Sequence, residues 1–194
     1  MRARFCVLLA FLCATPVAAA DLSPSSPIVP YGMPAARSFL SEIRIGGSVQ
    51  DPSGPESGSG SITGEILFPR LFAPSDAGLN VLIPRLHVGA SANVSGRTSF
   101  AYAGFTWTLD IGPAFFLEGT FGGAVHNGDV GRVDLSPHDA ALGCSPLFRE
   151  AASAGWRITP QWSAIATIEH LSNAGLCSQN RGLTNVGLRF GYAF

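Results

Sequence analysis

The sequence predicts an all-β fold, and more narrowly an eight-stranded antiparallel transmembrane β-barrel of the bacterial outer membrane. Three observations favour it. Charged residues make up 13% of the 194 residues and hydrophobic residues 46%, whereas a typical soluble domain has about 25% charged residues. Apolar residues alternate with polar or small ones over many segments, which is typical of strands that separate two solvents. The chain ends on Phe194, and such a terminal aromatic resembles the carboxy-terminal signature of outer-membrane barrels.

The first residues are typical of a secretory signal peptide. Arg2 and Arg4 precede a short apolar stretch, and small residues follow it before Asp21, which is the pattern of a cleavable leader. An uncleaved anchor helix is the alternative, but the apolar stretch is shorter than the ~20 residues that a bilayer needs. We therefore predict a signal peptide over 1–20, a proline-rich periplasmic lead-in over 21–37 and the barrel over 38–194.

Charge and histidine spacing exclude two kinds of partner. Without the leader's two arginines, ten arginines face 13 acidic residues, which gives a formal charge of −3. This balance is not the basic footprint of a nucleic-acid-binding protein. His87, His126 and His138 lack the spacing of metal ligands, both among themselves and with the cysteines. We therefore expect no nucleic acid and no metal.

Two cysteines remain after the leader, Cys144 and Cys177. In an exported protein, two cysteines most simply pair as a disulfide. Two separate free thiols are the alternative.

The eight predicted strands follow from the alternation and from the turn residues between them. Each is near the ~9–11 residues that a tilted membrane strand needs, some with overhang. The strands are, in order, Ser38–Val49, Ser61–Leu71, Asn80–Ala92, Arg97–Ile111, Ala114–His126, Ser145–Ile158, Gln161–Ser172 and Thr184–Phe194. Turn-rich stretches lie at Asp51–Gly60, Ala73–Gly78, Asn127–Ala141 and Asn173–Leu183, with a tight turn at Thr159-Pro160.

The last strand shows the two faces most clearly. Val186, Leu188 and Phe190 share one face, and Arg189 lies between two glycines on the other, as expected for a narrow polar lumen. We expect Arg189 to pair inside the barrel with acids such as Glu42, Asp110, Glu118 or Glu169. A soluble secreted barrel is the alternative fold, and it would partition into buffer without detergent. Its charges should point outward, but here they are too few to coat an outer surface.

His170 and Ser172 are the residues most suited to chemistry. They are two apart on a predicted strand, so their side chains share a face with Cα atoms about 6.5–7 Å apart. A serine hydroxyl needs an adjacent base to act as a nucleophile, and a histidine at this spacing can reach it. Their face is that of Trp162 and Ile168, which we assign to lipid. The end of a strand, where headgroups begin, is a simpler explanation for a polar pair.

The segment from Leu147 to Phe194 is similar to the lipid A 3-O-deacylase family, whose members are eight-stranded outer-membrane barrels. The likeness rests on His170-Leu-Ser172-Asn173-Ala-Gly175, a short loop, and the final strand Val186-Gly-Leu-Arg-Phe-Gly-Tyr-Ala-Phe194. It is weaker in Ser41–Val49 and in Gly122-Gly-Ala-Val-His126.

The resemblance implies an esterase that removes the 3-O-linked acyl chain of lipid A through an acyl-enzyme, with no cofactor. His170 would be the general base and Ser172 the nucleophile. Asn173 and Gly175 would line the oxyanion hole, where donors meet the charge on the attacked carbonyl oxygen. The partner would be lipopolysaccharide in the outer membrane. The oligomeric state stays open, a homodimer included.

The predicted topology places the pair where such an enzyme needs it. If Phe194 ends at the periplasm, the strand before the last runs outward. His170 and Ser172 then lie at its external end and face the leaflet that holds lipopolysaccharide. A disulfide between Cys144 and Cys177 would tie the loop after Ser172 to the preceding strand pair.

One position departs from the family pattern. The family has an acid about fourteen residues after the histidine, and here that position is Thr184. Thr184 shares the lipid-facing side and can accept the N–H of His170, but it carries no charge. A hydrogen bond to a charged group is worth about 1.5–3 kcal/mol against about 0.5–1.5 for a neutral one, so the expected loss is roughly tenfold. Glu169 points to the opposite face and is a poor substitute for the missing acid. A loop acid such as Asp139 is the remaining candidate.

Two functions therefore stay open. The first is an outer-membrane esterase that trims lipid A. The alternative is a catalytically weak or inactive outer-membrane barrel with a structural or surface-interaction role. Phospholipase or general esterase activity is a variant of the first, because the sequence does not define acyl selectivity.

Overall fold

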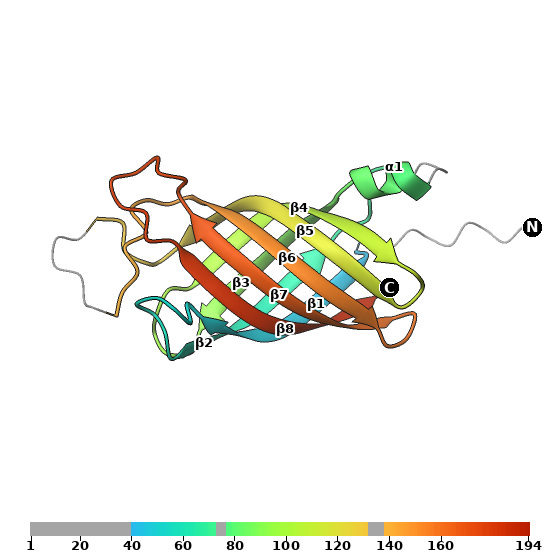
Figure 1. The fold of residues 1–194 in the computed structure, drawn as a ribbon, viewed down its shortest axis with the longest axis horizontal. Helices are drawn as coiled ribbons and strands as arrows, with labels where there is room; N and C mark the ends of the chain where they lie inside the picture. Colours follow the sequence, from blue (N-terminus) through green and yellow to red (C-terminus); the bar gives the residue numbers. More distant parts are fainter. Residues whose placement is uncertain (1–39, 73–76, 132–137) are drawn as a thin grey trace, which may run out of the picture. The chain divides into compact units, whose positions relative to one another are not determined.

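The computed structural model describes residues 40–72, 77–131 and 138–194. Eight strands form one closed barrel in which each strand pairs antiparallel with the next and β1 pairs with β8 (Figure 1). The strands are β1 Glu42–Gln50, β2 Ser59–Leu67, β3 Arg85–Asn93, β4 Phe100–Ile111, β5 Phe115–His126, β6 Leu147–Arg157, β7 Trp162–Ser172 and β8 Leu183–Ala193. The predicted fold class is confirmed. The signal peptide and lead-in predicted over 1–37 lie outside the described residues.

Three predicted boundaries are wrong for local reasons. Asn80–Leu82, predicted to begin a strand, belongs to the short helix α1, Ala77–Leu82. The carbonyl of Leu82 accepts a hydrogen bond from the Trp107 indole at 3.2 Å, so the helix lies against β4. Strand β2 ends at Leu67 because Pro69 follows closely and has no N–H for a ladder. Arg97 precedes β4 in a turn, where its N–H is bound by the Asn93 side chain.

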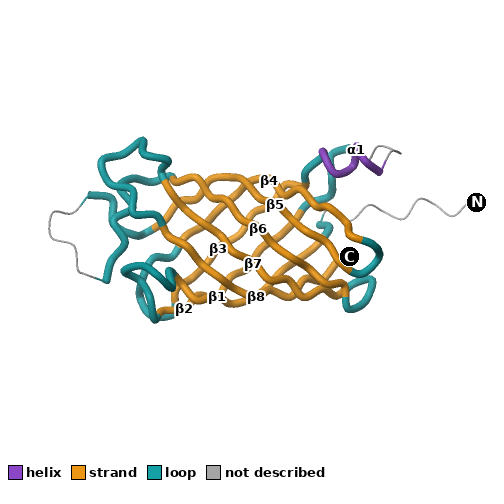
Figure 2. The backbone as a smooth tube through the Cα atoms, in the orientation of Figure 1, coloured by secondary structure: helices purple, strands orange, loops and turns teal. Residues whose placement is uncertain are grey.

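One end of the barrel carries loops, and the other carries the tight turns and the β2–β3 connection that contains α1 (Figure 2). The loops β1–β2, β3–β4, β5–β6 and β7–β8 gather at one end (Figure 2). The tight turns β4–β5 and β6–β7 lie at the other end, together with α1 and Phe194. From β4 onward, tight turns alternate with longer loops. The long-loop end is the external end of an outer-membrane barrel.

The barrel interior is filled by charged side chains that neutralise one another. Arg44 contacts Glu42 at 2.8 Å and Glu118 at 2.7 Å, and the fully buried Arg149 contacts Glu169 at 2.6 Å. Such pairs fill a lumen that is too narrow for a pore. The remaining pairs inside the barrel join Arg44 to Glu65, Arg85 to Glu42 and Glu118, and Arg189 to Glu65 and Glu169.

The expected partners of Arg189 need one correction. Of the four acids named from the sequence, it contacts Glu169 alone, and Glu65 supplies its second carboxylate. Asp110 lies at the rim, where it pairs with Arg157. The reason is the closure of the barrel, which pairs β8 with β1. Only β1 then separates Arg189 from Glu65 on β2.

The outward faces of the strands are apolar. Ile45, Phe105, Trp156 and Leu188 are between 45% and 66% exposed. This apolar belt surrounds the barrel, as a lipid-facing surface requires. No helix among the described residues is long and apolar enough to cross a membrane.

Candidate functional site

His170 and Ser172 lie on the outward face of β7, where the strand reaches the long loops. Buried residues alternate along β7 with outward ones, among them Trp162 and Ile168, which are about half exposed. His170 and Ser172 share the outward parity and are partly exposed. The lipid-facing assignment made from the sequence therefore agrees with the burial pattern.

The His170 ring is held from the side of β8. His170 and Thr184 are direct partners in the β7–β8 register, and Nδ1 of His170 lies 2.8 Å from Oγ1 of Thr184. A Cβ on Gly182 would lie only 2.7 Å from Cε1 of the ring. Gly182 also has a φ of 71°, a conformation that favours glycine. The ring thus occupies space that a larger residue at 182 would fill.

Ser172 is the last residue of β7 and pairs in register with Phe148. Within the described residues, the hydrogen bond of the His170 ring goes to Thr184 and not to Ser172. In ligand-free proteins, catalytic hydrogen bonds are often long and tighten only with substrate. The structure therefore places Ser172 beside His170 on one face without joining them.

A tight turn follows Ser172. The N–H of Leu176 donates to the carbonyl of Asn173 at 3.0 Å. Ala174 and Gly175, the two central residues, have φ values of 53° and 80°, which is the pattern of a type I′ turn. A left-handed alanine is unusual, and such strain is found preferentially at functional sites.

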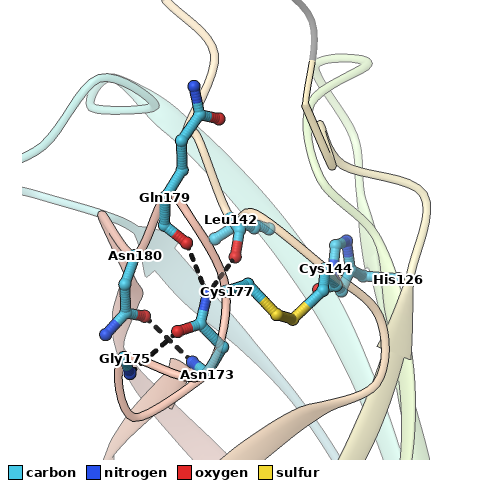
Figure 3. The surroundings of a disulfide bond; sticks show 8 residues. All are labelled: His126, Leu142, Cys144, Asn173, Gly175, Cys177, Gln179 and Asn180. Atoms are coloured by element: carbon cyan, nitrogen blue, oxygen red, sulfur yellow. Dashed lines mark hydrogen bonds between the residues drawn. A yellow bond between two sulfur atoms is a disulfide. The ribbon is translucent and has the colours of Figure 1, made fainter.

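The Asn173 side chain points into the protein and not toward the outward face. It is buried, and its Nδ2 donates to the carbonyls of Leu142 at 2.9 Å and Gln179 at 2.5 Å (Figure 3). Its Oδ1 accepts the N–H of Gly175 at 2.9 Å. The backbone N–H of Asn173 donates to Asn180 at 2.9 Å. The donors suggested for an oxyanion hole are thus engaged within the protein.

Cys144 and Cys177 form a disulfide, with an S–S distance of 2.01 Å, so the predicted pairing is confirmed. It joins the β5–β6 loop to the β7–β8 loop (Figure 3). Asn173 joins the same two loops through Leu142. The turn after Ser172 is therefore joined to the β5–β6 loop by a disulfide and by a hydrogen bond.

Neither acid considered from the sequence contacts His170. Glu169 lies inside the barrel, where it binds Arg149 and accepts from Asn185. Asp139 pairs with Arg97 at 3.2 Å. Both carboxylates therefore have partners of their own.

Sequence reasoning missed a third acid, Glu150 on β6. It is exposed, shares the outward face, and is the direct register partner of His170. The alternation in Leu147–Arg157 indicates its outward direction, but the pairing with His170 depends on the strand register.

Glu150, His170 and Thr184 line one open groove on the outer surface. Its walls include Trp107, Phe121 and Ile168. A second groove shares residues with it and runs along the same strands. This second groove is almost entirely apolar, and its lining combines small and larger side chains: Ala152, Ala154, Ala166, Leu117, Val186 and Leu188. The site therefore adjoins an apolar groove on the lipid-facing surface.

The described residues contain no cluster of three or more His, Cys, Asp or Glu side chains that could hold a metal ion. The chemistry available at this site is that of a histidine, a hydroxyl and a carboxylate.

Comparisons with known proteins agree with the barrel fold. Residues 68–193 match the family model described as lipid A 3-O-deacylase (PagL). The crystal structure of the outer-membrane enzyme PagL superposes with a TM-score of 0.61 at 16% identity, covering 79% of this chain and all of that one. A designed transmembrane β-barrel gives a TM-score of 0.52 at 12% identity, covering 82% of this chain and 98% of that one. No curated protein sequence matches the chain.

Proposed function

Because the chain belongs to the lipid A 3-O-deacylase (PagL) family, we propose that it is an esterase that removes the 3-O-linked acyl chain of lipid A. The family and the closed barrel make it a protein of the bacterial outer membrane. Lipid A is then the substrate and the surrounding membrane its source. All the residues to which we assign a role come from one chain, so the proposed chemistry does not require a dimer.

The observation that carries the proposal is the direction of His170 and Ser172. Both lie on the lipid-facing side of β7, at the end with the long loops. Apart from Glu150, the charged residues of the described strands share the inward parity, so a polar pair on the lipid-facing side needs a reason. A substrate ester in the outer leaflet would meet Ser172 without leaving the membrane.

The proposed reaction has two halves. Oγ of Ser172 attacks the ester carbonyl while His170 takes its proton, and a tetrahedral intermediate forms. The bond from the carbonyl carbon to the sugar oxygen then breaks, and His170 returns the proton to that oxygen. Water, activated by His170, next attacks the acyl-serine, which releases the fatty acid and restores the hydroxyl of Ser172.

Thr184 orients the His170 ring for this reaction. Its Oγ1 can accept the Nδ1–H of His170 across 2.8 Å. That tautomer leaves Nε2 unprotonated and able to take the serine proton. Thr184 therefore orients the base but adds no negative charge.

Asn173 and Gly175 remain our proposed source of oxyanion donors. The N–H of Gly175 now donates to the Asn173 amide oxygen. A charged oxyanion is a stronger acceptor than a neutral amide oxygen. The N–H would therefore change partner as the tetrahedral intermediate forms, while the left-handed turn keeps it near Ser172.

Mass spectrometry of lipid A tests the proposal. Lipid A is incubated with the refolded protein, with Ser172→Ala and with His170→Ala. We expect loss of one 3-hydroxyacyl chain with the wild type alone. Phospholipid vesicles in a parallel reaction measure selectivity. Intact lipid A with the folded wild type would favour the alternative, a structural or surface-interaction barrel without this activity.

A further inference from the structure

Glu150 is an unusual residue for a lipid-facing surface. Within the eight strands as described, the other Asp, Glu and Arg residues share the inward parity, and most form ion pairs there or at the rim. Glu150 alone among them points outward, and it is exposed. A carboxylate toward lipid is unfavourable, and an ionisable residue in that position marks a functional site by default. The outward direction of Glu150 therefore needs an explanation in the chemistry of the site.

Its neighbour in the register supplies that explanation. Glu150 on β6 pairs with His170 on β7, and His170 pairs with Thr184 on β8. The three form one row across adjacent strands, all on the outward face. Side chains directly opposite in antiparallel strands have Cβ atoms about 4.5–5.5 Å apart. Glu150 also lines the same open groove as His170 and Thr184.

We propose that Glu150 is the positioning residue that supplies, from β6, the negative charge that Thr184 does not supply from β8. This inference rests on the proposed function. When His170 takes the proton of Ser172, the ring becomes a cation between Glu150 and Thr184. The carboxylate of Glu150 attracts that cation, while Thr184 holds Nδ1. No proton moves to Glu150.

The other nearby acids do not fill this role. Glu169 is adjacent in sequence but lies on the inner side, bound to Arg149 and Asn185. Asp139 is bound to Arg97 in the loops. Glu150 and Glu169 both line the groove that contains His170, but of these two Glu150 is the exposed, outward-facing one and Glu169 is buried.

Steady-state kinetics on lipid A test the role through rescue. Glu150→Gln keeps the size and loses the charge, and we expect kcat to fall roughly tenfold with KM little changed, because the charge acts on a cation formed during the reaction. Glu150→Asp should keep most of the activity. The double variant Glu150→Gln with Thr184→Glu should recover most of the loss, since it returns an acid to His170 from the opposite strand.

A matched control moves the acid along the strand. Glu150→Gln with Ala152→Glu keeps one outward carboxylate on β6 but places it opposite Ile168. We expect no recovery from it. Heat-modifiable migration on gels verifies that each variant is folded.

The outcomes separate the two proposals. An active wild type with unchanged kcat in Glu150→Gln overturns the role of Glu150 and leaves the proposed function standing. A rise in KM alone also overturns it, because Glu150 would then bind substrate. Equal rescue by Ala152→Glu and Thr184→Glu would mean that any carboxylate on this surface restores activity, which also overturns a specific role for Glu150. An inactive folded wild type overturns the proposed function and this inference with it.

Discussion

His170 and Thr184 face each other across the last two strands, and Nδ1 of the ring lies 2.8 Å from the threonine hydroxyl. A neutral hydroxyl thus stands where the family pattern has an acid. It can fix the tautomer of the ring but cannot balance the charge that forms there.

Thr184→Val removes the hydroxyl and keeps the shape of the side chain. The Nδ1–H then loses its acceptor, and we predict a fall in kcat of up to about tenfold from the loss of one neutral hydrogen bond. Thr184→Ser retains the hydroxyl and should remain close to the wild type. Rates of acyl release from lipid A measure both variants. Equal rates for valine and threonine would show that another group orients His170.

Gly182 is predicted to be necessary for the position of the ring. A Cβ there would lie 2.7 Å from Cε1 of His170, so Gly182→Ala should displace the ring from its position against Thr184. A displacement of about 1 Å can reduce a rate about 10²-fold. Gly96→Ala is the control, because Gly96 has a similar φ of 76° but no atom within 4 Å of an added Cβ. Similar losses in both variants would mean that backbone strain, and not the ring, is responsible.

The disulfide is predicted to stabilise the external loops and not the barrel itself. Cys144 and Cys177 are 33 residues apart in sequence, and removing such a bond typically costs about 2–4 kcal/mol. For Cys144→Ser with Cys177→Ser, we predict inactivation at a lower temperature while the strands remain folded by circular dichroism. Reduced wild type should behave like the double variant. Identical inactivation temperatures would contradict a stabilising role.

The ion pairs inside the barrel are predicted to contribute much more to the free energy of unfolding than the ion pair at its rim. Arg44 is buried against three carboxylates, at 2.7 Å from Glu118 and 3.4 Å from Glu65 among them. Arg44→Met should cost about 3–5 kcal/mol of unfolding free energy, because it leaves buried carboxylates uncompensated. Arg157→Met at the exposed rim pair with Asp110 should cost less than about 1 kcal/mol. Urea unfolding in vesicles measures both, and equal values would refute the distinction.

The sequence predicted the two faces of the strands well because side-chain direction alternates along a strand whatever its neighbours are. It therefore placed Ser172 and His170 on the lipid side and Arg189 inside. The cysteine pair was also predictable, since only two cysteines lie outside the predicted leader. The helix over Ala77–Leu82 was not, because six mostly apolar residues suit a strand equally well.

The partners of each residue were harder to predict than its direction. Glu150 lies next to His170 only because the strands close in one particular register, which local alternation does not reveal. The inward direction of the Asn173 amide has a similar origin. It is set by the carbonyls of Leu142 and Gln179, and Leu142 belongs to a loop far away in sequence.

In the proposed mechanism, Ser172 is a nucleophile activated by His170. A fluorophosphonate, which reacts covalently with activated serines, tests it most directly when the modified residue is located by peptide mass spectrometry. We predict modification of Ser172 in the refolded wild type, protection by added lipid A, and loss of labelling in His170→Ala. Labelling of a different serine, or equal labelling of Ser172 in His170→Ala, would contradict the mechanism.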